Sequence, residues 1–261
     1  MSGAPPLALR ESRPLLGPAA DASRALLRAG ACLGALCTEL LTFPAGTDGV
    51  ERQHHAAFAA HRLARRVLDI NGVQVTVAGR TPSGPVVLAC NHLGYLDPIV
   101  LGALLPLAAI AKAELGHWPL LGRAAARLGT LFVRRGSPQH GAVVLRQAFR
   151  RLAAGIPVLN FPEGTTTDGS GPLLPFRRGL FGIARRAGAP VVPVALRLEP
   201  EDAAWVGGAP FLPHYWRMTV RPSARAVVRF GEPVDPRAFA SAQACADEVR
   251  GRVERLRKGP S

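Results

Sequence analysis

His92 and Asp97 are a pair of side chains whose types and spacing could do chemistry. They lie in the run Asn-His-Leu-Gly-Tyr-Leu-Asp, residues 91–97, directly after the apolar run VVLAC. A histidine that a carboxylate holds in place can remove a proton from a hydroxyl group at neutral pH. The spacing alone also fits a less specific interpretation, in which Asp97 caps a helix and His92 is a hydrogen-bonded core residue.

A second polar motif follows another apolar run. Residues 161–169 read Phe-Pro-Glu-Gly-Thr-Thr-Thr-Asp-Gly and combine a glycine-assisted turn with hydroxyl groups and a carboxylate. Such a loop is suited to binding a glycerol-like or phosphate-bearing acceptor. By itself it fits an ordinary strand-to-helix connection equally well. The two motifs together favour a binding and catalytic site.

Short β-rich runs and helix-length segments alternate along the part of the chain that carries both motifs. The β-rich runs cover residues 72–79, 86–90, 107–112, 130–135, 157–162, 191–196 and 224–230, and helix-length segments include 118–128 and 141–154. This alternation predicts an α/β layered fold with a largely parallel central sheet flanked by helices. Functional side chains in such folds lie at the carboxyl ends of strands. Residues 236–258 predict one basic amphipathic helix on the outside.

The N-terminal part predicts a loosely ordered leader over 1–23, two membrane-associating helices within 24–70, and one α/β domain over 71–261. The apolar stretch 24–43 is long enough to cross a bilayer, but Arg28 and Glu39 interrupt it, which favours a helix on or dipping into the membrane. An ordinary core helix stays open as the alternative. Residues 50–68 predict a second helix, whose Arg62, Arg65 and Arg66 could meet phosphate headgroups.

The 261 residues carry a formal net charge of +14, which indicates an acidic partner: nucleic acid, an anionic lipid surface or an acidic carrier protein. Nucleic acid is disfavoured, because the basic residues are spread along the chain and only 6% of residues are aromatic. Neither the histidines at 54, 55 and 61 nor the four cysteines have metal-site spacing, so we expect no metal. Cys90 has the strand parity of a buried core thiol.

The sequence resembles the lysophospholipid acyltransferase family, which includes the 1-acylglycerol-3-phosphate O-acyltransferases. Four blocks occur in the family's order between residues 72 and 234: NHLGYLD, GTLFVRR over 129–135, FPEGT, and VVPVAL from residue 191. Lys112 and Glu114 match a Lys-x-Glu segment between the first two blocks. The resemblance implies a glycerol-3-phosphate acyltransferase-like fold.

The resemblance also implies the chemistry. His92 would deprotonate an acceptor hydroxyl, Asp97 would orient it, and the alkoxide would attack the thioester of acyl-CoA or an acylated carrier protein, with no bound cofactor. A G-x-S-x-G nucleophile elbow is absent from the sequence, which fits direct transfer. Asn91 would shape the loop around His92. The other residues expected to bind the acceptor are Arg135, Glu163, Gly164, Thr165, Thr166, Arg177 and Arg178.

Two departures from the family pattern leave the acceptor open. Thr166 stands where phosphatidate-forming members usually have arginine, which removes a bidentate phosphate ligand unless Arg177 or Arg178 replaces it. The Thr-Thr-Thr-Asp-Gly continuation resembles lyso-ornithine-lipid acyltransferases instead. Arg134 stands where many relatives have an acid, and its charge favours an anionic acceptor.

Three hypotheses result. The first is acylation of a lysophospholipid, most simply 1-acylglycerol-3-phosphate, by a peripheral or monotopic enzyme at the cytoplasmic face of a bacterial inner membrane. The second is acylation of lyso-ornithine lipid. The third, a non-catalytic lipid-binding protein, is disfavoured by the intact His92 and Asp97.

Overall fold

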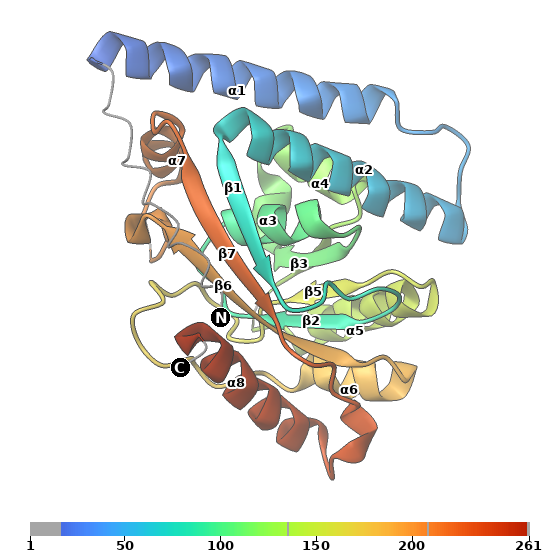
Figure 1. Ribbon diagram of the computed structural model, residues 1–261. Coiled ribbons are helices and arrows are strands. Elements are labelled where there is room, and N and C mark those ends of the chain that lie inside the picture. The colour runs from blue at the N-terminus through green and yellow to red at the C-terminus, as the bar shows by residue number, and fades with distance from the viewer. Residues whose placement is uncertain (1–16, 135, 208, 260–261) are drawn as a thin grey trace, which may run out of the picture.

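The computed structural model describes residues 17–134, 136–207 and 209–259, and its centre is one β-sheet (Figure 1). Within these ranges the sheet has seven strands. They are β1 (Val73–Ala78), β2 (Val87–Cys90), β3 (Ala108–Lys112), β4 (Leu131–Val133), β5 (Val158–Asn160), β6 (Val191–Glu199) and β7 (Ala224–Phe230). Each strand lies within one of the seven runs expected from the sequence or extends it at one end.

The strand order is β1-β7-β6-β2-β5-β3-β4. All neighbouring strands run parallel except β6 and β7, which are antiparallel. The predicted largely parallel sheet is therefore confirmed. Parallel strands need crossover connections, which place helices on both faces of the sheet.

Helices cover the two faces and form an additional outer layer (Figure 1). One face carries α5 (Pro138–Ala153), α6 (Gly179–Ala187) and α8 (Ala242–Lys258), and the other carries α2 (Gly49–Asn71), α3 (Leu96–Leu104), α4 (Leu121–Arg127) and α7 (Phe211–Thr219). Short 3-10 turns cover Ala113–His117, Glu201–Ala203 and Pro236–Ala238. The helix α1 (Pro18–Leu41) packs outside α2 and α7.

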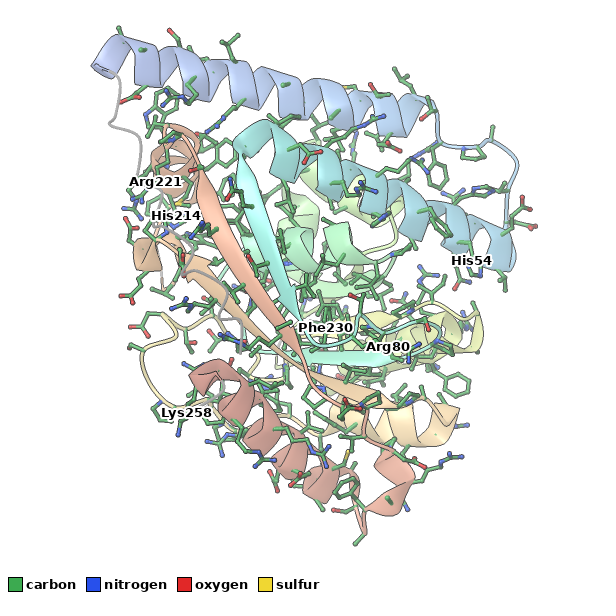
Figure 2. The ribbon with its side chains drawn as sticks, in the orientation of Figure 1. His54, Arg80, His214, Arg221, Phe230 and Lys258 are labelled. Atoms are coloured by element: carbon green, nitrogen blue, oxygen red, sulfur yellow. The ribbon has the colours of Figure 1, made fainter. Side chains whose placement is uncertain are left out.

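Strand β2 shows how the sequence divides the core between these two layers. Val87 and Ala89 pack in the cluster with α5, α6 and α8, whereas Leu88 and Cys90 pack in the cluster with α2 and α3. All four are fully buried, as expected for a central strand covered on both faces. Side chains fill the space on either side of the sheet (Figure 2). The alternation of side chains along β2 therefore supplies both halves of the core and fixes where the chain leaves the sheet toward His92.

The N-terminal helix α1 begins at Pro18, so the predicted leader is wrong for residues 18–23; residues 1–16 lie outside the described part. Proline suits a first helical position, because the backbone nitrogen there needs no hydrogen-bond partner. Arg24 donates to the carbonyl of Val220, which fixes this first part of α1 against the end of α7. The predicted helix over 50–68 is confirmed as α2.

The two charges that interrupt the apolar stretch of α1 both point toward the protein. Arg28 donates to the carbonyls of Thr219, the last residue of α7, and of Arg221 and Pro222 just beyond it. Glu39 is 2% exposed and forms ion pairs with two arginines of α2, Arg62 at 2.7 Å and Arg66 at 3.4 Å. These contacts attach α1 to the α/β domain. In the described residues, no helix is long and apolar enough to cross a membrane.

Two predicted helices are interrupted in the structure. The segment 118–128 becomes helical only at Leu121, because Pro119 favours an extended backbone at Trp118. The segment 236–258 divides into the turn Pro236–Ala238 and α8, because Ser241 accepts a hydrogen bond from the Ala244 N–H and starts a new helix there. The sequence contained both signals, Pro119 and Ser241.

Candidate active site

The carboxyl ends of four neighbouring parallel strands form the floor of the site. His92 follows β2, Glu163 follows β5, Lys112 ends β3 and Arg134 follows β4. Since these strands are parallel and adjacent, their carboxyl ends meet at one edge of the sheet. The sheet therefore brings together the motifs that the sequence separates by 71 residues between His92 and Glu163.

The ring of His92 is held by the buried carboxylate of Asp97. Its Nδ1 lies 2.6 Å from Asp97 Oδ2, and the same oxygen accepts hydrogen bonds from the backbone N–H groups of Leu93 at 2.6 Å and Gly94 at 2.9 Å. Asp97 lies in the first turn of α3, where the helix dipole stabilises a carboxylate. This arrangement orients Nδ1–H toward Asp97 and leaves Nε2 as the proton acceptor.

The alternative interpretation, in which Asp97 caps a helix, is wrong: α3 has no side-chain cap hydrogen bond, and Asp97 accepts from N–H groups that precede the helix. A single oxygen caps the loop and orients the histidine, whereas Oδ1 is buried and has no hydrogen-bond partner within the described residues. A buried carboxylate oxygen without a partner is rare away from functional sites. The Asp97 carboxylate thus stabilises the loop through its backbone hydrogen bonds and also holds the His92 ring in one orientation.

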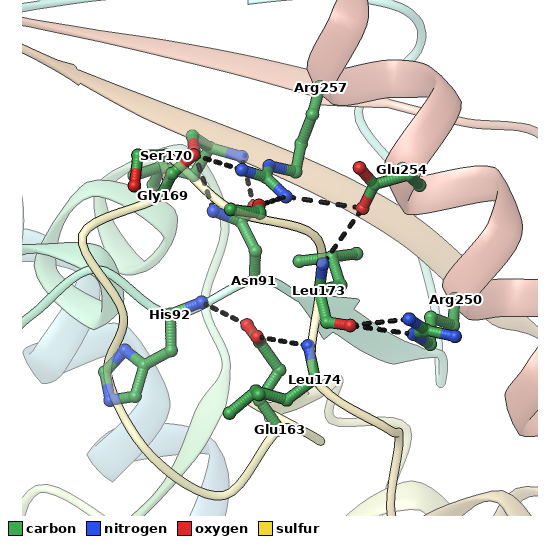
Figure 3. Close-up of polar contacts among 12 residues, drawn as sticks. Asn91, His92, Glu163, Gly169, Ser170, Leu173, Leu174, Arg250, Glu254 and Arg257 are labelled. Atoms are coloured by element: carbon green, nitrogen blue, oxygen red, sulfur yellow. Dashed lines mark hydrogen bonds and ion pairs between the residues drawn. The ribbon is translucent and has the colours of Figure 1, made fainter.

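Three further contacts fix His92 from other directions. Its ring stacks on Phe161, with ring centroids 4.0 Å apart and planes inclined by 14°. Its backbone N–H donates to Glu163 Oε1 at 3.1 Å, and its carbonyl accepts from the Thr167 N–H at 2.9 Å. Figure 3 shows the bond to Glu163. The second motif thus holds both the ring and the backbone of His92.

Glu163 supports the backbone and does not line the cavity that contains the His92 ring. It is 5% exposed, and its second oxygen accepts from the Leu174 N–H at 3.1 Å. Burial raises the pKa of Glu163, while the two backbone hydrogen bonds act in the opposite direction because they favour the ionised form. Both oxygens are therefore occupied by the protein itself, which makes Glu163 a support for His92.

The Asn91 side chain bonds to the neighbouring strand β6. Its side-chain amide donates to the Leu196 carbonyl at 2.9 Å and accepts from the Leu196 N–H at 2.8 Å, which continues the pairing of β2 with β6. Its side chain is therefore bonded to β6, and Asn91 does not line the cavity that contains the His92 ring. The neighbouring Cys90 is fully buried, and burial raises the pKa of its thiol well above the usual range, as for an inert core residue.

The His92 ring opens into a cavity of about 920 Å³. Its polar lining residues include Lys112, Glu114, Arg134, Thr165, Thr166 and Arg177, and its apolar ones include Ile110, Phe132, Val144, Leu145 and Leu180. Lys112 and Glu114 lie 3.7 Å apart as an exposed ion pair. The cavity therefore offers cationic groups near a proton acceptor and an apolar surface beside them. Among the described residues, no cluster of His, Cys, Asp and Glu could hold a metal ion.

Gly164 and Arg177 both line the cavity and lie in close contact. Gly164 has φ of +74°, and a side chain there would place its Cβ 2.7 Å from Nε of Arg177. Glycine thus permits both the turn and the close approach of the guanidinium. Of the predicted arginines, Arg177 lines the cavity, whereas Arg178 is exposed and does not. Arg135 lies outside the described residues.

A group of aromatic residues that lines the cavity was missed from the sequence. Tyr95, Trp118 and Trp205 line the cavity, and Phe211 of α7 contacts all three rings. The Trp205 backbone N–H donates to the Leu93 carbonyl at 2.7 Å, which links this group to the loop that carries His92. Only Tyr95 gave a signal in the sequence, because it lies inside the first motif.

Comparisons of the sequence with known proteins find acyltransferases. The family model described as Acyltransferase matches residues 72–197. A lyso-ornithine lipid O-acyltransferase of Brucella abortus is 33% identical over 218 residues, which cover 75% of this chain and 79% of that protein. Its counterpart in Pseudomonas aeruginosa is 36% identical over 62% of this chain and 64% of its own length. A 1-acyl-sn-glycerol-3-phosphate acyltransferase of Neisseria gonorrhoeae is 38% identical over 60% and 61%.

The fold has a solved counterpart as well. The crystal structure of the 1-acyl-sn-glycerophosphate acyltransferase PlsC from Thermotoga maritima superposes with a TM-score of 0.64 at 22% identity, over 91% of this chain and 96% of that one. The family model and the Brucella abortus relative identify this fold as an acyltransferase domain. The chain belongs to the lysophospholipid acyltransferase family.

Proposed function

We propose that the protein transfers a fatty acyl group from a thioester to the hydroxyl of a lysolipid. The observation that carries this proposal is the 2.6 Å contact between His92 Nδ1 and Asp97 Oδ2 at the edge of the cavity. His92 Nε2 takes the proton of the acceptor hydroxyl as its oxygen attacks the thioester carbonyl. The tetrahedral intermediate then expels the thiolate, which takes the proton from His92. The products are the ester and the free thiol.

The donor in this proposal is acyl-CoA or an acylated carrier protein. Both are anionic, and the net charge of +14 suits either one. The apolar lining of the cavity offers a surface for an acyl chain next to His92. The charge of the protein therefore supports a thioester donor of this type without selecting between the two.

For the acceptor we propose 1-acylglycerol-3-phosphate. Three cations, Lys112, Arg134 and Arg177, line the cavity against one acid, Glu114, so an anionic headgroup would be attracted. Arg177 lies against Gly164 of the FPEGT motif, and in this proposal its guanidinium replaces the arginine that phosphatidate-forming relatives usually have at position 166. Arginine binds phosphate through paired donors.

Lyso-ornithine lipid is the second candidate. Thr166 lines the cavity, and the Brucella and Pseudomonas relatives carry that activity in their names. A threonine hydroxyl can bind an acceptor that has no phosphomonoester. The two candidates differ in whether the headgroup needs Arg177 as a phosphate ligand.

Arg177→Ala separates these candidates. With 1-acylglycerol-3-phosphate we expect kcat/KM to fall about 10- to 100-fold, the value of one hydrogen bond between charged groups. Acyl transfer is measured on a panel that also holds lyso-ornithine lipid and other lysophospholipids. Arg178→Ala is the matched control, because Arg178 is the neighbouring arginine outside the cavity lining, and it should stay near wild type.

Selective acylation of lyso-ornithine lipid by the wild type would instead support the second candidate. Thr166→Arg should then improve the use of phosphate-bearing acceptors. An unchanged acceptor profile in Thr166→Arg would show that this position does not select the headgroup.

We also propose that α1 holds the protein on an anionic membrane, at the cytoplasmic face of a bacterial inner membrane. Leu26, Leu27, Leu33 and Leu41 are 64%, 74%, 47% and 86% exposed. At about 100° per residue they fall within a third of the helix circumference, while Arg28 and Glu39 point toward the protein. An outward face without charge between Leu26 and Leu41 fits the headgroup and acyl-chain boundary of a bilayer.

Leu27→Ser tests this membrane contact by cosedimentation with vesicles that contain phosphatidylglycerol. In this proposal the Leu27 side chain is buried in the lipid, which contributes about 1.5 to 3 kcal/mol. Its replacement by serine should therefore weaken vesicle binding about tenfold. Val143→Ser is the control, because Val143 is 40% exposed on α5, across the sheet from α1. Equal binding by both variants would contradict the assignment of α1 as the membrane contact.

A further inference from the structure

Both backbone groups of Leu173 are bound by side chains of the C-terminal helix α8. Arg250 donates to the Leu173 carbonyl through Nε at 3.1 Å and through a terminal nitrogen at 2.6 Å. Glu254 Oε2 accepts from the Leu173 N–H at 3.2 Å. Figure 3 shows these contacts together. Both the N–H and the carbonyl of Leu173 thus have hydrogen-bond partners, as they would inside a β-sheet, although Leu173 lies in an irregular loop.

A third side chain of α8 holds the same loop nearer to its start. Arg257 donates to the carbonyls of Gly169 and Gly171 and forms an ion pair with Glu254 at 3.3 Å. Arg250, Glu254 and Arg257 are spaced by four and three residues, so they lie on one face of the helix. We call the loop residues 169–174 the bridging segment.

Hydrogen bonds through Glu163 link the bridging segment to the backbone of His92. Leu174, next to Leu173, donates its N–H to Glu163 Oε2, and Glu163 Oε1 accepts the N–H of His92, both at 3.1 Å. At the other end of the segment, a side chain on Gly169 would place its Cβ 3.0 Å from a methyl carbon of Leu93. The segment is therefore linked to the His92 loop through Glu163 and lies close to the same loop at Gly169.

The charge of Arg257 supports the same connection. Glu163 is buried, and each of its two carboxylate oxygens accepts a backbone hydrogen bond, which favours the ionised form. Burial raises the pKa of Glu163, and the positive charge of Arg257 acts in the opposite direction. Arg257 thus favours the ionised form of Glu163 that holds His92, although it lies on a helix outside the catalytic cavity.

We propose that Arg250, Glu254 and Arg257 of α8 are positioning residues for acyl transfer, which they support through the bridging segment, Glu163 and the backbone of His92. The inference rests on the proposed role of His92 as the base. Proton transfer requires the base within hydrogen-bond reach of the acceptor hydroxyl, and a displacement of about 1 Å can reduce a rate about 100-fold. The C-terminal helix would thus set kcat without contacting a substrate.

Arg250→Ala is the test, with Arg252→Ala as the matched control. Arg252 lies on the same helix but pairs with Glu248 at 2.8 Å, away from the bridging segment. We expect Arg250→Ala to lower kcat at least about tenfold with KM for the acceptor within about twofold of wild type. Arg250→Lys should recover part of kcat, because one ammonium can still donate to the Leu173 carbonyl. Arg252→Ala should behave as wild type.

Hydrogen exchange supplies a readout that does not depend on turnover. In Arg250→Ala the amides of residues 91–97 and 169–174 should exchange faster, and those of the β6–β7 pair should not change. Unchanged exchange in 91–97 would overturn the proposal. So would a wild-type kcat, a change confined to KM, or an equal loss in Arg252→Ala. If the wild type acylated no lysolipid, the proposed function would fail while the exchange result still decided whether α8 positions the loop.

Discussion

His92→Ala is expected to lower kcat for acyl transfer about 100- to 10,000-fold, the range that a general base contributes. His92 Nε2 is the proton acceptor that the geometry leaves facing the cavity, since Nδ1 is bonded to Asp97. The thiol released from acyl-CoA, followed with a thiol reagent in the presence of the lysolipid, measures the rate. The product ester should decrease in parallel.

The fold should survive this substitution. Only the ring contacts with Phe161 and Asp97 are lost, while the backbone of residue 92 keeps its bonds to Glu163 and Thr167. The circular dichroism spectrum and vesicle binding should therefore match wild type. His55→Ala is the control, because that histidine is exposed on α2 and pairs with Glu51. Near-normal turnover by His92→Ala would rule out the proposed mechanism.

Asp97→Asn is expected to reduce kcat by about 100- to 10,000-fold while the protein stays folded. An asparagine carbonyl at the position of Oδ2 can still accept from the Leu93 and Gly94 N–H groups. It cannot stabilise the positive charge that His92 acquires when it takes the proton. The loss should therefore appear in kcat at unchanged thermal stability, measured by turnover and calorimetry on the same samples.

Asp97→Ala separates the two roles of that oxygen. It should lose the same activity and also stability, because two buried N–H groups lose their acceptor at a cost of about 1 to 3 kcal/mol each. The melting temperature should decrease relative to both wild type and Asp97→Asn. A wild-type kcat in Asp97→Asn would show that the carboxylate only caps the loop.

Local sequence patterns determined the sheet and the place of the two motifs. Alternating apolar residues define strands such as β2 and β5, and helix-length connections between them imply parallel pairing. Once His92 and Glu163 both follow parallel strands, their meeting at one edge is a geometric consequence. Strand parity alone was likewise enough to assign Cys90 to the core, where it is fully buried.

Helix ends were less predictable, because they depend on single residues. The sequence signals at Pro119 and Ser241 were local, but a continuous amphipathic pattern masked them. The start of α1 at Pro18 was missed because the composition before Arg24 resembled a leader. In the structure, Arg24 and Arg28 bond to residues 219–222, and no sequence pattern near α1 encodes such contacts.

The sequence by itself therefore determined the α/β class, the family and the choice of His92 and Asp97 as the proposed catalytic pair, since each follows from local spacing or from motif order. Only the tertiary structure decided how the remaining side chains are used. Glu163 turns to backbone groups and away from the cavity, Arg177 enters the cavity where Arg178 does not, and Arg250 reaches Leu173 across 77 residues. These choices depend on which surfaces pack together, and contacts between distant residues leave no periodic trace in the chain.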